Sequence, residues 1–227
     1  MLKKLFKKKK GETVQELLRL KADARDNEWT QRFYNLIPEE DLYFDDLNPF
    51  WGPDNLPYVK LFLKPKSYTA KLPEISEHCI TFGLGAVLIW EKPDEPDWVF
   101  SCGDIVSLAN FGAILSGASV SGHEQYQVDQ PEEVTVGNPS EKFLPSSIRA
   151  ILKQDFQENF EQQNPGVFLM FNPKLSPPHS MVFSIEKSTF GGDINLFENA
   201  MQRIAWHLPK HCPATSISEG DFEYFPL

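Results

Sequence analysis

A cysteine, an aspartate and a histidine near the middle of the sequence have the residue types of a nucleophilic site. Cys102 and Asp104 are two positions apart, and His123 follows downstream. A thiol nucleophile needs a base such as histidine, and a carboxylate can orient that base. The chain holds three cysteines and five histidines, so chance also supplies such a set. A buried cysteine at a strand end, followed by a helix cap, is the structural interpretation that we prefer. Catalysis by these three residues remains the enzymatic alternative.

A second group near the C-terminus has the residue types of a metal site. His207, His211 and Cys212 are close together, and two histidines four apart bind zinc when one helix presents both. Pro209 lies between the histidines and interrupts the helix that this geometry requires. The three cysteines are widely spaced, with no CxxC pair. We therefore expect no metal and no cofactor.

Acidic and aromatic residues alternate over a short stretch of the N-terminal half, which gives the chain its candidate binding residues. They are Asp41, Tyr43, Phe44, Asp45, Asp46, Phe50 and Trp51. The acids lack the spacing of a calcium loop. Aromatic anchors surrounded by charge are typical of protein interfaces. The stretch therefore predicts a docking surface for a protein, with a solvated acidic face as the simpler alternative.

The charge of the chain indicates what kind of partner it accepts. Six of the 22 Lys and Arg residues lie within the first ten positions, so the other 16 face 32 Asp and Glu residues. Such a body repels phosphate backbones, and we expect no nucleic-acid binding by the folded part. A basic protein partner is easier to attract, as in an immunity-type inhibitor of a basic enzyme. We expect residues 1–12 to be a flexible basic tail. If that tail contacts an anionic surface, the protein would instead be a structural component of a larger assembly.

The sequence also predicts a compartment. The basic N-terminus is not followed by the apolar stretch of a signal peptide. The longest apolar run, residues 82–90, is too short to cross a bilayer. Three widely spaced cysteines suit a reducing environment. We therefore expect a cytoplasmic protein without a membrane span.

Hydrophobic periodicity predicts a mixture of helices and strands. Thr13 and Glu16 form a capping box for a first helix, and a second helix ends before Pro38. Further helices are expected at residues 73–82, 145–162 and 194–208, with an ambiguous pattern at 104–115. Helical spacing places Phe82 on the buried stripe of the first with Ile75 and Cys79, and Ile194 on the buried face of the last. Strands are expected at residues 58–63, 86–90, 98–101, 134–136, 167–171 and 181–185. Residues 39–57 carry turn signals and are expected to be a connection.

This order of elements predicts an α+β fold with antiparallel or mixed sheets covered by amphipathic helices. After the tail we expect an N-terminal α+β module over residues 13–125 and a C-terminal α+β module over 126–227. The two either stand in tandem or pack as a single domain. The long polar stretch around residues 116–142 is the expected boundary.

Two segments of the chain resemble the SseB-like (enhanced serine sensitivity) family of bacterial cytoplasmic proteins. The first contains Leu20-Lys-Ala-Asp-Ala, Arg32-Phe-Tyr-Asn-Leu-Ile37 and Asp41-Leu-Tyr-Phe44, and it is similar to a pair of short helices leading to a strand. The second contains Val167-Phe-Leu-Met-Phe171 and Met181-Val-Phe-Ser-Ile-Glu186, and it is similar to a closing strand–strand–helix module. The resemblance covers about half of the chain and supplies no catalytic residues. It implies a small α+β module with a non-enzymatic role, so we expect a protein-binding or regulatory protein.

Overall fold

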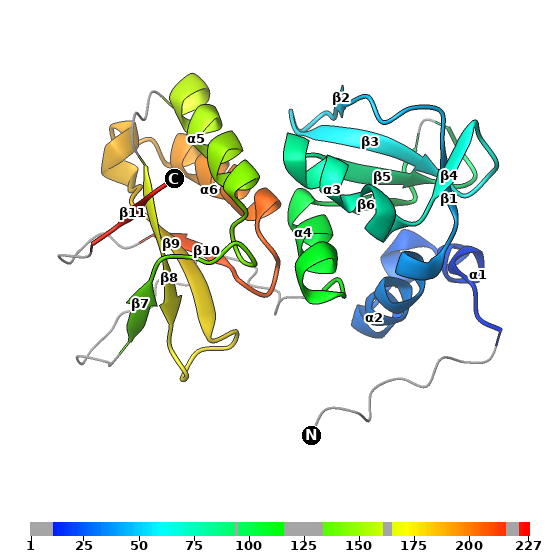
Figure 1. The fold of residues 1–227 in the computed structure, drawn as a ribbon, viewed down its shortest axis with the longest axis horizontal. Helices are drawn as coiled ribbons and strands as arrows, with labels where there is room; N and C mark the ends of the chain where they lie inside the picture. The colour runs from blue at the N-terminus through cyan, green and yellow to red at the C-terminus, as the bar shows by residue number, and fades with distance from the viewer. Residues whose placement is uncertain (1–10, 94, 116–133, 161–164, 217–222) are drawn as a thin grey trace.

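Two mixed β-sheets, each covered by helices, make up the part of the chain that the structure describes (Figure 1). The structure is a computed structural model, and it describes residues 11–93, 95–115, 134–160, 165–216 and 223–227. The fold is α+β, as the order of elements predicts, and each sheet with its helices forms a small module. None of the described helices has the length and apolar character that a membrane crossing requires.

The first sheet is built from residues of the N-terminal half. Its strands are β1 (Leu42–Phe44), β2 (Phe50–Trp51), β3 (Pro57–Phe62), β4 (Tyr68–Ala70), β5 (Gly85–Ile89) and β6 (Trp98–Phe100). The order is β4-β1-β3-β5-β6, and only the pair β3–β5 is parallel. β5 occupies one side of β3 along its length, so β1 and β2 both pair with the other side of β3. β5 is central and buried at all five residues, which explains its continuous apolar sequence.

Helices cover one face of the first sheet. They are α1 (Val14–Leu18), α2 (Asn27–Leu36), α3 (Leu72–Phe82) and α4 (Cys102–Phe111), with single 3-10 turns at Ala22–Ala24 and Ile37–Glu39. Thr13 caps α1 through its side-chain oxygen, as the sequence indicates, and the structure shows that Asp26 caps α2 in the same way. Trp29 stacks on Phe33 with ring centroids 5.1 Å apart in the core beneath these helices. The opposite face of β3 carries Tyr58, Lys60 and Phe62, none of which belongs to this core.

The second sheet is built from residues of the C-terminal half. Its strands are β7 (Thr135–Gly137), β8 (Gly166–Phe171), β9 (His179–Phe183), β10 (Ala214–Ser216) and β11 (Phe225–Pro226). The order is β10-β9-β8-β11, with β7 also paired to β8, and only the pair β9–β10 is parallel. The helices α5 (Ser146–Phe160) and α6 (Ile194–His207) pack on this sheet, and a 3-10 turn at Lys187–Phe190 precedes α6. Asp193 caps α6 by accepting hydrogen bonds from the backbone of Asn195 and Leu196.

The helices of the two modules face each other, with α3 against α5 and α4 against α6 (Figure 1). α4 contributes to both cores, and its residues from Cys102 to Leu108 are all buried. Its N-terminus lies against the backbone that follows α6, because a Cβ atom at Gly103 would lie 1.8 Å from the carbonyl oxygen of Leu208. Trp206 of α6 likewise reaches Gly85, where an added Cβ would lie 2.7 Å from the indole. Glycine at these two positions permits the close approach of the modules.

The structure differs from the sequence-based expectations in several details. Residues 39–57 are not only a connection, since they form β1 and β2. The ambiguous segment is a helix whose N-cap is Ser101, and Asp104 occupies the third helical position, in the first turn. Phe82, expected on the buried stripe of α3, lies outside the core and is 60% exposed. It is the last residue of the helix, and Gly83 is the C-cap. Ile194, expected on the buried face of α6, is 38% exposed.

Candidate functional site

The predicted docking residues lie along one edge of the first sheet, and we refer to residues 41–51 as the acidic edge. β1 and β2 pair with the same side of β3, so the chain between them follows that edge. Beyond β1 the sheet continues only with the short strand β4. The side chain of His78 on α3 donates a hydrogen bond to the carbonyl oxygen of Leu47, at 3.2 Å, and so joins this segment to the helix layer.

The carboxylates of the acidic edge do not share one environment. Asp45 accepts hydrogen bonds from Ser67 and forms an ion pair with Lys66, at 3.2 Å. These hydrogen bonds from Ser67 and Lys66 lower the pKa of Asp45 below its ordinary value. Asp46 accepts a hydrogen bond from the backbone of Asn48, at 2.9 Å, and stays exposed. Asp41 is also exposed. Among the described residues, neither Asp41 nor Asp46 has an ion-pair partner within 4.0 Å.

The aromatic residues of the acidic edge point to both faces of the sheet. Phe44 packs toward the helix-covered core and stacks on Tyr68, with ring centroids 5.8 Å apart. Tyr43 pairs with Phe62 of β3. Phe62 lies on the face of the sheet opposite α1 to α4, which we refer to as the open face. Phe50 also lies on the open face, 6.0 Å from the ring of Tyr58.

Trp51 is the most exposed aromatic residue of the acidic edge. It is 67% exposed, whereas Tyr43, Phe44 and Phe50 are all half-buried. Side chains alternate between the faces of a strand, so Trp51 points to the face opposite Phe50. The structure thus separates the seven predicted residues into buried, paired and exposed ones. Trp51 is exposed, as are Asp41 and Asp46, which have no ion-pair partner within 4.0 Å in the described part of the chain.

Two lysines that the sequence did not associate with this surface also lie on it. The ammonium group of Lys60 lies 4.8 Å from the centroid of Phe50, and that of Lys66 lies 4.4 Å from the centroid of Phe62. Both lysines lie over aromatic rings on the face of the sheet opposite α1 to α4. The helix α6 covers part of this face, because Trp206 packs on Tyr58 with ring centroids 5.6 Å apart. This face thus carries two lysines, and also Asp54, whose carboxylate accepts a hydrogen bond from the hydroxyl of Tyr58.

The alternative catalytic set can be placed in part. Cys102 is fully buried in the first turn of α4, and its burial, the neighbouring Cys79 and Asp104 raise its thiol pKa well above the ordinary value. A buried, protonated thiol is a poor nucleophile. His123 lies outside the described residues, so the assembly of the full set stays a prediction.

Asp104 has a partner that the sequence did not reveal. Its carboxylate accepts hydrogen bonds from the backbone of Ser101, at 3.0 Å, and from the ammonium group of Lys210, at 2.9 Å. The same ammonium group donates to the hydroxyl of Tyr34, at 3.2 Å. Asp104 is only 1% exposed. The carboxylate therefore caps α4 and joins the two modules through Lys210.

The histidines that resemble metal ligands have different partners and environments. The Nδ1 atom of His207 donates to the carbonyl oxygen of Arg203, at 2.8 Å, and the ring is buried. Burial lowers the pKa of His207 to about 4. His211 lies past the end of α6, with its ring centroid 4.7 Å from that of Phe111. No group of three metal-ligating side chains occurs among the described residues.

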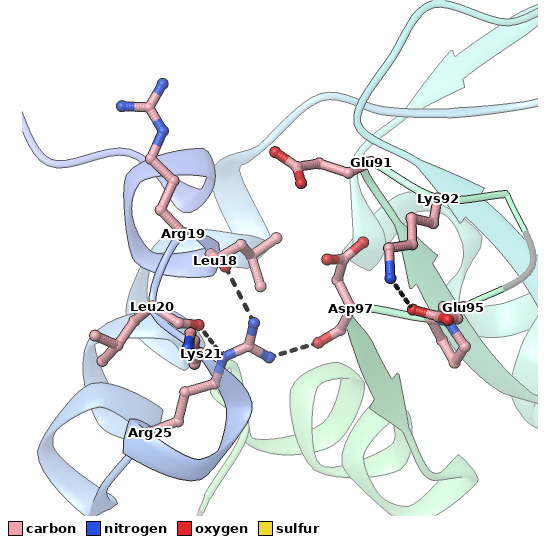
Figure 2. A pocket seen from close by; sticks show the side chains of 10 residues that line it. Leu18, Arg19, Leu20, Lys21, Arg25, Glu91, Lys92, Glu95 and Asp97 are labelled. Carbon is pink, nitrogen blue, oxygen red and sulfur yellow. Dashed lines mark hydrogen bonds and ion pairs between the residues drawn. The ribbon is translucent and has the colours of Figure 1, made fainter.

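A shallow polar pocket of about 310 Å³ lies between the end of α1 and the turn after β5 (Figure 2). At its wall, Arg25 donates hydrogen bonds to the carbonyl oxygens of Leu18, Leu20 and Asp97, at 3.1, 3.0 and 2.6 Å. On the other side Lys92 pairs with Glu95, at 2.6 Å. The guanidinium is thus occupied by the backbone of its own module. This arrangement fastens the N-terminal helices to the sheet and provides no free cation for a ligand at Arg25.

Comparison of the chain with protein-family models, with curated proteins and with solved structures gives no match.

Proposed function

We propose that this chain is a non-catalytic cytoplasmic protein that docks a basic protein partner through its acidic edge. The observation that carries this proposal is the exposure of Trp51, at 67%, on the two-residue strand β2 of the acidic edge. Tryptophan contributes strongly to binding when a partner buries it, and leaving it in water has no benefit for folding. An immunity-type inhibitor of a basic enzyme is one concrete form of this function.

Charge supports the choice of a basic partner. From Pro38 to Pro57 the chain has six acidic residues and no Lys or Arg. Asp41 and Asp46 lack ion-pair partners among the described residues, so a cation from another protein can approach them. The net charge of −10 attracts a basic partner over longer distances. All three cysteines are unpaired and buried, which supports a reducing compartment.

The buried carboxylate and thiol support a non-catalytic role. Asp104 is engaged by Lys210 and Ser101, and Cys102 is shielded from solvent. The SseB-like resemblance remains a prediction and is compatible with this function.

The proposal is tested with the full chain as bait in a cell extract, followed by mass spectrometry and by kinetics with the purified partner. We expect Trp51→Ala and Asp46→Lys to lose the partner that the wild type retains. Leu196→Ala is the matched control, because Leu196 is 46% exposed on the other module. Association should slow by about tenfold or more between low and high salt. The proposal is contradicted if a tightly bound partner associates at a rate that does not depend on salt concentration. It is also contradicted if that partner binds both variants as it binds the wild type.

A further inference from the structure

Phe82 is an exposed aromatic residue that the acidic edge does not include. It lies in the last turn of α3 and is 60% exposed, next to Gly83, which closes the helix in the left-handed conformation. The ring of Phe82 contacts only its helical neighbour His78 among the described aromatic pairs, at 5.0 Å between centroids. The residues that follow are buried, since Ile151 of α5 packs against Gly83. The junction of the modules therefore begins immediately after Phe82 and leaves its ring outside.

The strand register places Trp51 and Phe82 at the same end of the first sheet. Trp51 pairs with Pro57 at the start of β3, and Tyr58 pairs with Gly85 at the start of the parallel strand β5. Phe82 precedes β5 by three residues, so it lies at this same end. Two strand spacings, about 10 Å, separate the strand of Trp51 from the strand that follows Phe82.

Both side chains also lie on the helix side of the sheet. Phe50 packs on the open face with Tyr58, so Trp51 points away from that face. α3 covers the helix side through Leu72 and Ile75. His78, which touches Phe82, is hydrogen-bonded to the backbone of Leu47 in the acidic edge. The contact connects the end of α3 to the chain that leads into β2.

The two segments that carry this pair contain acidic residues and no Lys or Arg. Arg203 of α6, which donates to the carbonyl oxygen of Asn55, is itself paired with Asp155. α3 contains Glu74 and Glu77, both exposed, and no Lys or Arg. The chain from Asp45 to Pro57 likewise contains acids but no Lys or Arg. The lysines that lie over aromatic rings of the first sheet, Lys60 and Lys66, belong to the opposite, open face. A ligand that covers Trp51 and Phe82 therefore meets acidic groups around two apolar anchors.

We propose that Trp51 and Phe82 are the two anchors of one docking surface and that it binds a basic amphipathic helix of the partner protein. Positions i and i+7 of a helix are about 10.5 Å apart, which is close to the two strand spacings between β2 and β5. Helices that dock in this way present apolar residues at such spacings, and Lys or Arg on their flanks would meet Asp46 and Glu77. The inference rests on the proposed function and adds to it the form of the partner's contact and a residue from a second element.

The test uses a synthetic 15-residue helical peptide rich in Lys, with Leu at two positions seven apart, titrated by calorimetry into the full chain. We expect binding to the wild type, and a loss of about tenfold or more in affinity for each of Trp51→Ala and Phe82→Ala. Leu196→Ala should bind as the wild type does. A peptide with Glu in place of Lys, and one with Ser in place of one Leu, should both bind at least tenfold more weakly. Circular dichroism checks that each variant is folded, which exposed positions should permit.

The outcomes separate the inference from the proposed function. If Trp51→Ala weakens binding and Phe82→Ala does not, the surface stops at the acidic edge and this inference fails while the function stands. If the wild type does not bind the Lys peptide, or binds the Glu peptide equally, a basic helix is the wrong occupant and the inference fails. If neither substitution changes binding of the peptide or of the partner retained from extract, both the inference and the function at this surface fail.

Discussion

The ammonium nitrogen of Lys210 lies 2.9 Å from the carboxylate of Asp104, although the two residues come from different modules. Asp104 is 1% exposed, whereas 43% of the Lys210 side chain is in contact with solvent. One carboxylate oxygen of Asp104 is buried and has no hydrogen-bond partner among the residues that the structure describes. The ion pair is therefore the main compensation for a buried charge at the start of α4.

Replacement of Lys210 by Met should destabilise the protein. The substitution keeps an aliphatic side chain but leaves Asp104 with only the backbone of Ser101 as a donor. We expect a loss of about 2 kcal/mol in the free energy of unfolding, at the low end for a buried pair because water reaches Lys210. Chemical denaturation measures this loss. The control is Lys142→Met, because Lys142 is exposed and has no side-chain ion pair in the described structure. Equal stability of the two variants would show that the pair is unimportant.

The same pair should give a dependence on alkaline pH. Desolvation lowers the pKa of Lys210, but the charge of Asp104 and the hydrogen bonds from Lys210 to Asp104 and Tyr34 outweigh it and raise the pKa overall. A raised pKa means that the folded state holds the proton more tightly than the unfolded state. The stabilisation is therefore complete below the ordinary lysine pKa of about 10.4 and is lost as the pH rises through the folded value. Wild type and Lys210→Met should converge in stability as the pH is raised, and parallel curves would contradict this.

Gly103→Ala should be among the most damaging single-methyl additions in the chain. The new Cβ would lie 1.8 Å from the carbonyl oxygen of Leu208, and neither backbone can move aside as a side chain does. We expect a destabilisation of about 3 kcal/mol, from overpacking at the contact between α4 and the segment after α6. Gly137→Ala is the matched control, because nothing lies within 4 Å of its added Cβ. Thermal unfolding gives the melting temperatures of the two variants, and we expect that of Gly103→Ala to be clearly lower. Similar melting temperatures would rule out this close contact.

Long periodic elements could be predicted from the sequence, and so could the short strands β6 and β7, whereas β1, β2 and β4 could not. α6 and the strands β8 and β9 were visible because burial on one face repeats over many residues. β1, β2 and β4 have two or three residues each, too few for alternation to appear. They form because they pair with strands elsewhere in the sequence, as Leu42 does with Ala70. Local sequence does not contain that information.

The candidate site shows the same limit. The acidic and aromatic composition of residues 41–51 located the exposed Trp51. It did not show that Asp45 is paired with Lys66, because that contact depends on the pairing of β1 with β4. It did not include Phe82 either, because helical spacing placed that residue with the buried Ile75 and Cys79. Only the position of the helix end relative to the sheet leaves the ring exposed.

Stability should fall as the pH is lowered from about 6.5 toward 4, because of His207. Burial lowers the pKa of His207 to about 4, whereas in the unfolded chain it has its ordinary value near 6.5. The unfolded state therefore binds more protons in this window, and stability is full above it and decreases as the pH falls. The difference corresponds to about 3 kcal/mol by pH 4. His207→Asn keeps a donor for the carbonyl of Arg203 and should flatten the slope between pH 6.5 and 4.5, whatever its absolute stability. A ring resonance of His207 that titrates near pH 6.5 in the folded protein would contradict this.

All three cysteines should be inert toward iodoacetamide in the native state. Cys79, Cys102 and Cys212 are each 0% exposed, and burial raises the pKa of Cys79 and Cys212 to about 12 and that of Cys102 well above its ordinary value. Alkylation requires an accessible thiolate, so modification should proceed only as fast as the protein opens. Mass spectrometry after native labelling should show no adduct on a time scale in which guanidinium-unfolded protein takes up three. Rapid and selective labelling of Cys102 in the native protein would instead identify a reactive thiol, and the catalytic alternative with Asp104 and His123 would then replace the docking function as the leading hypothesis.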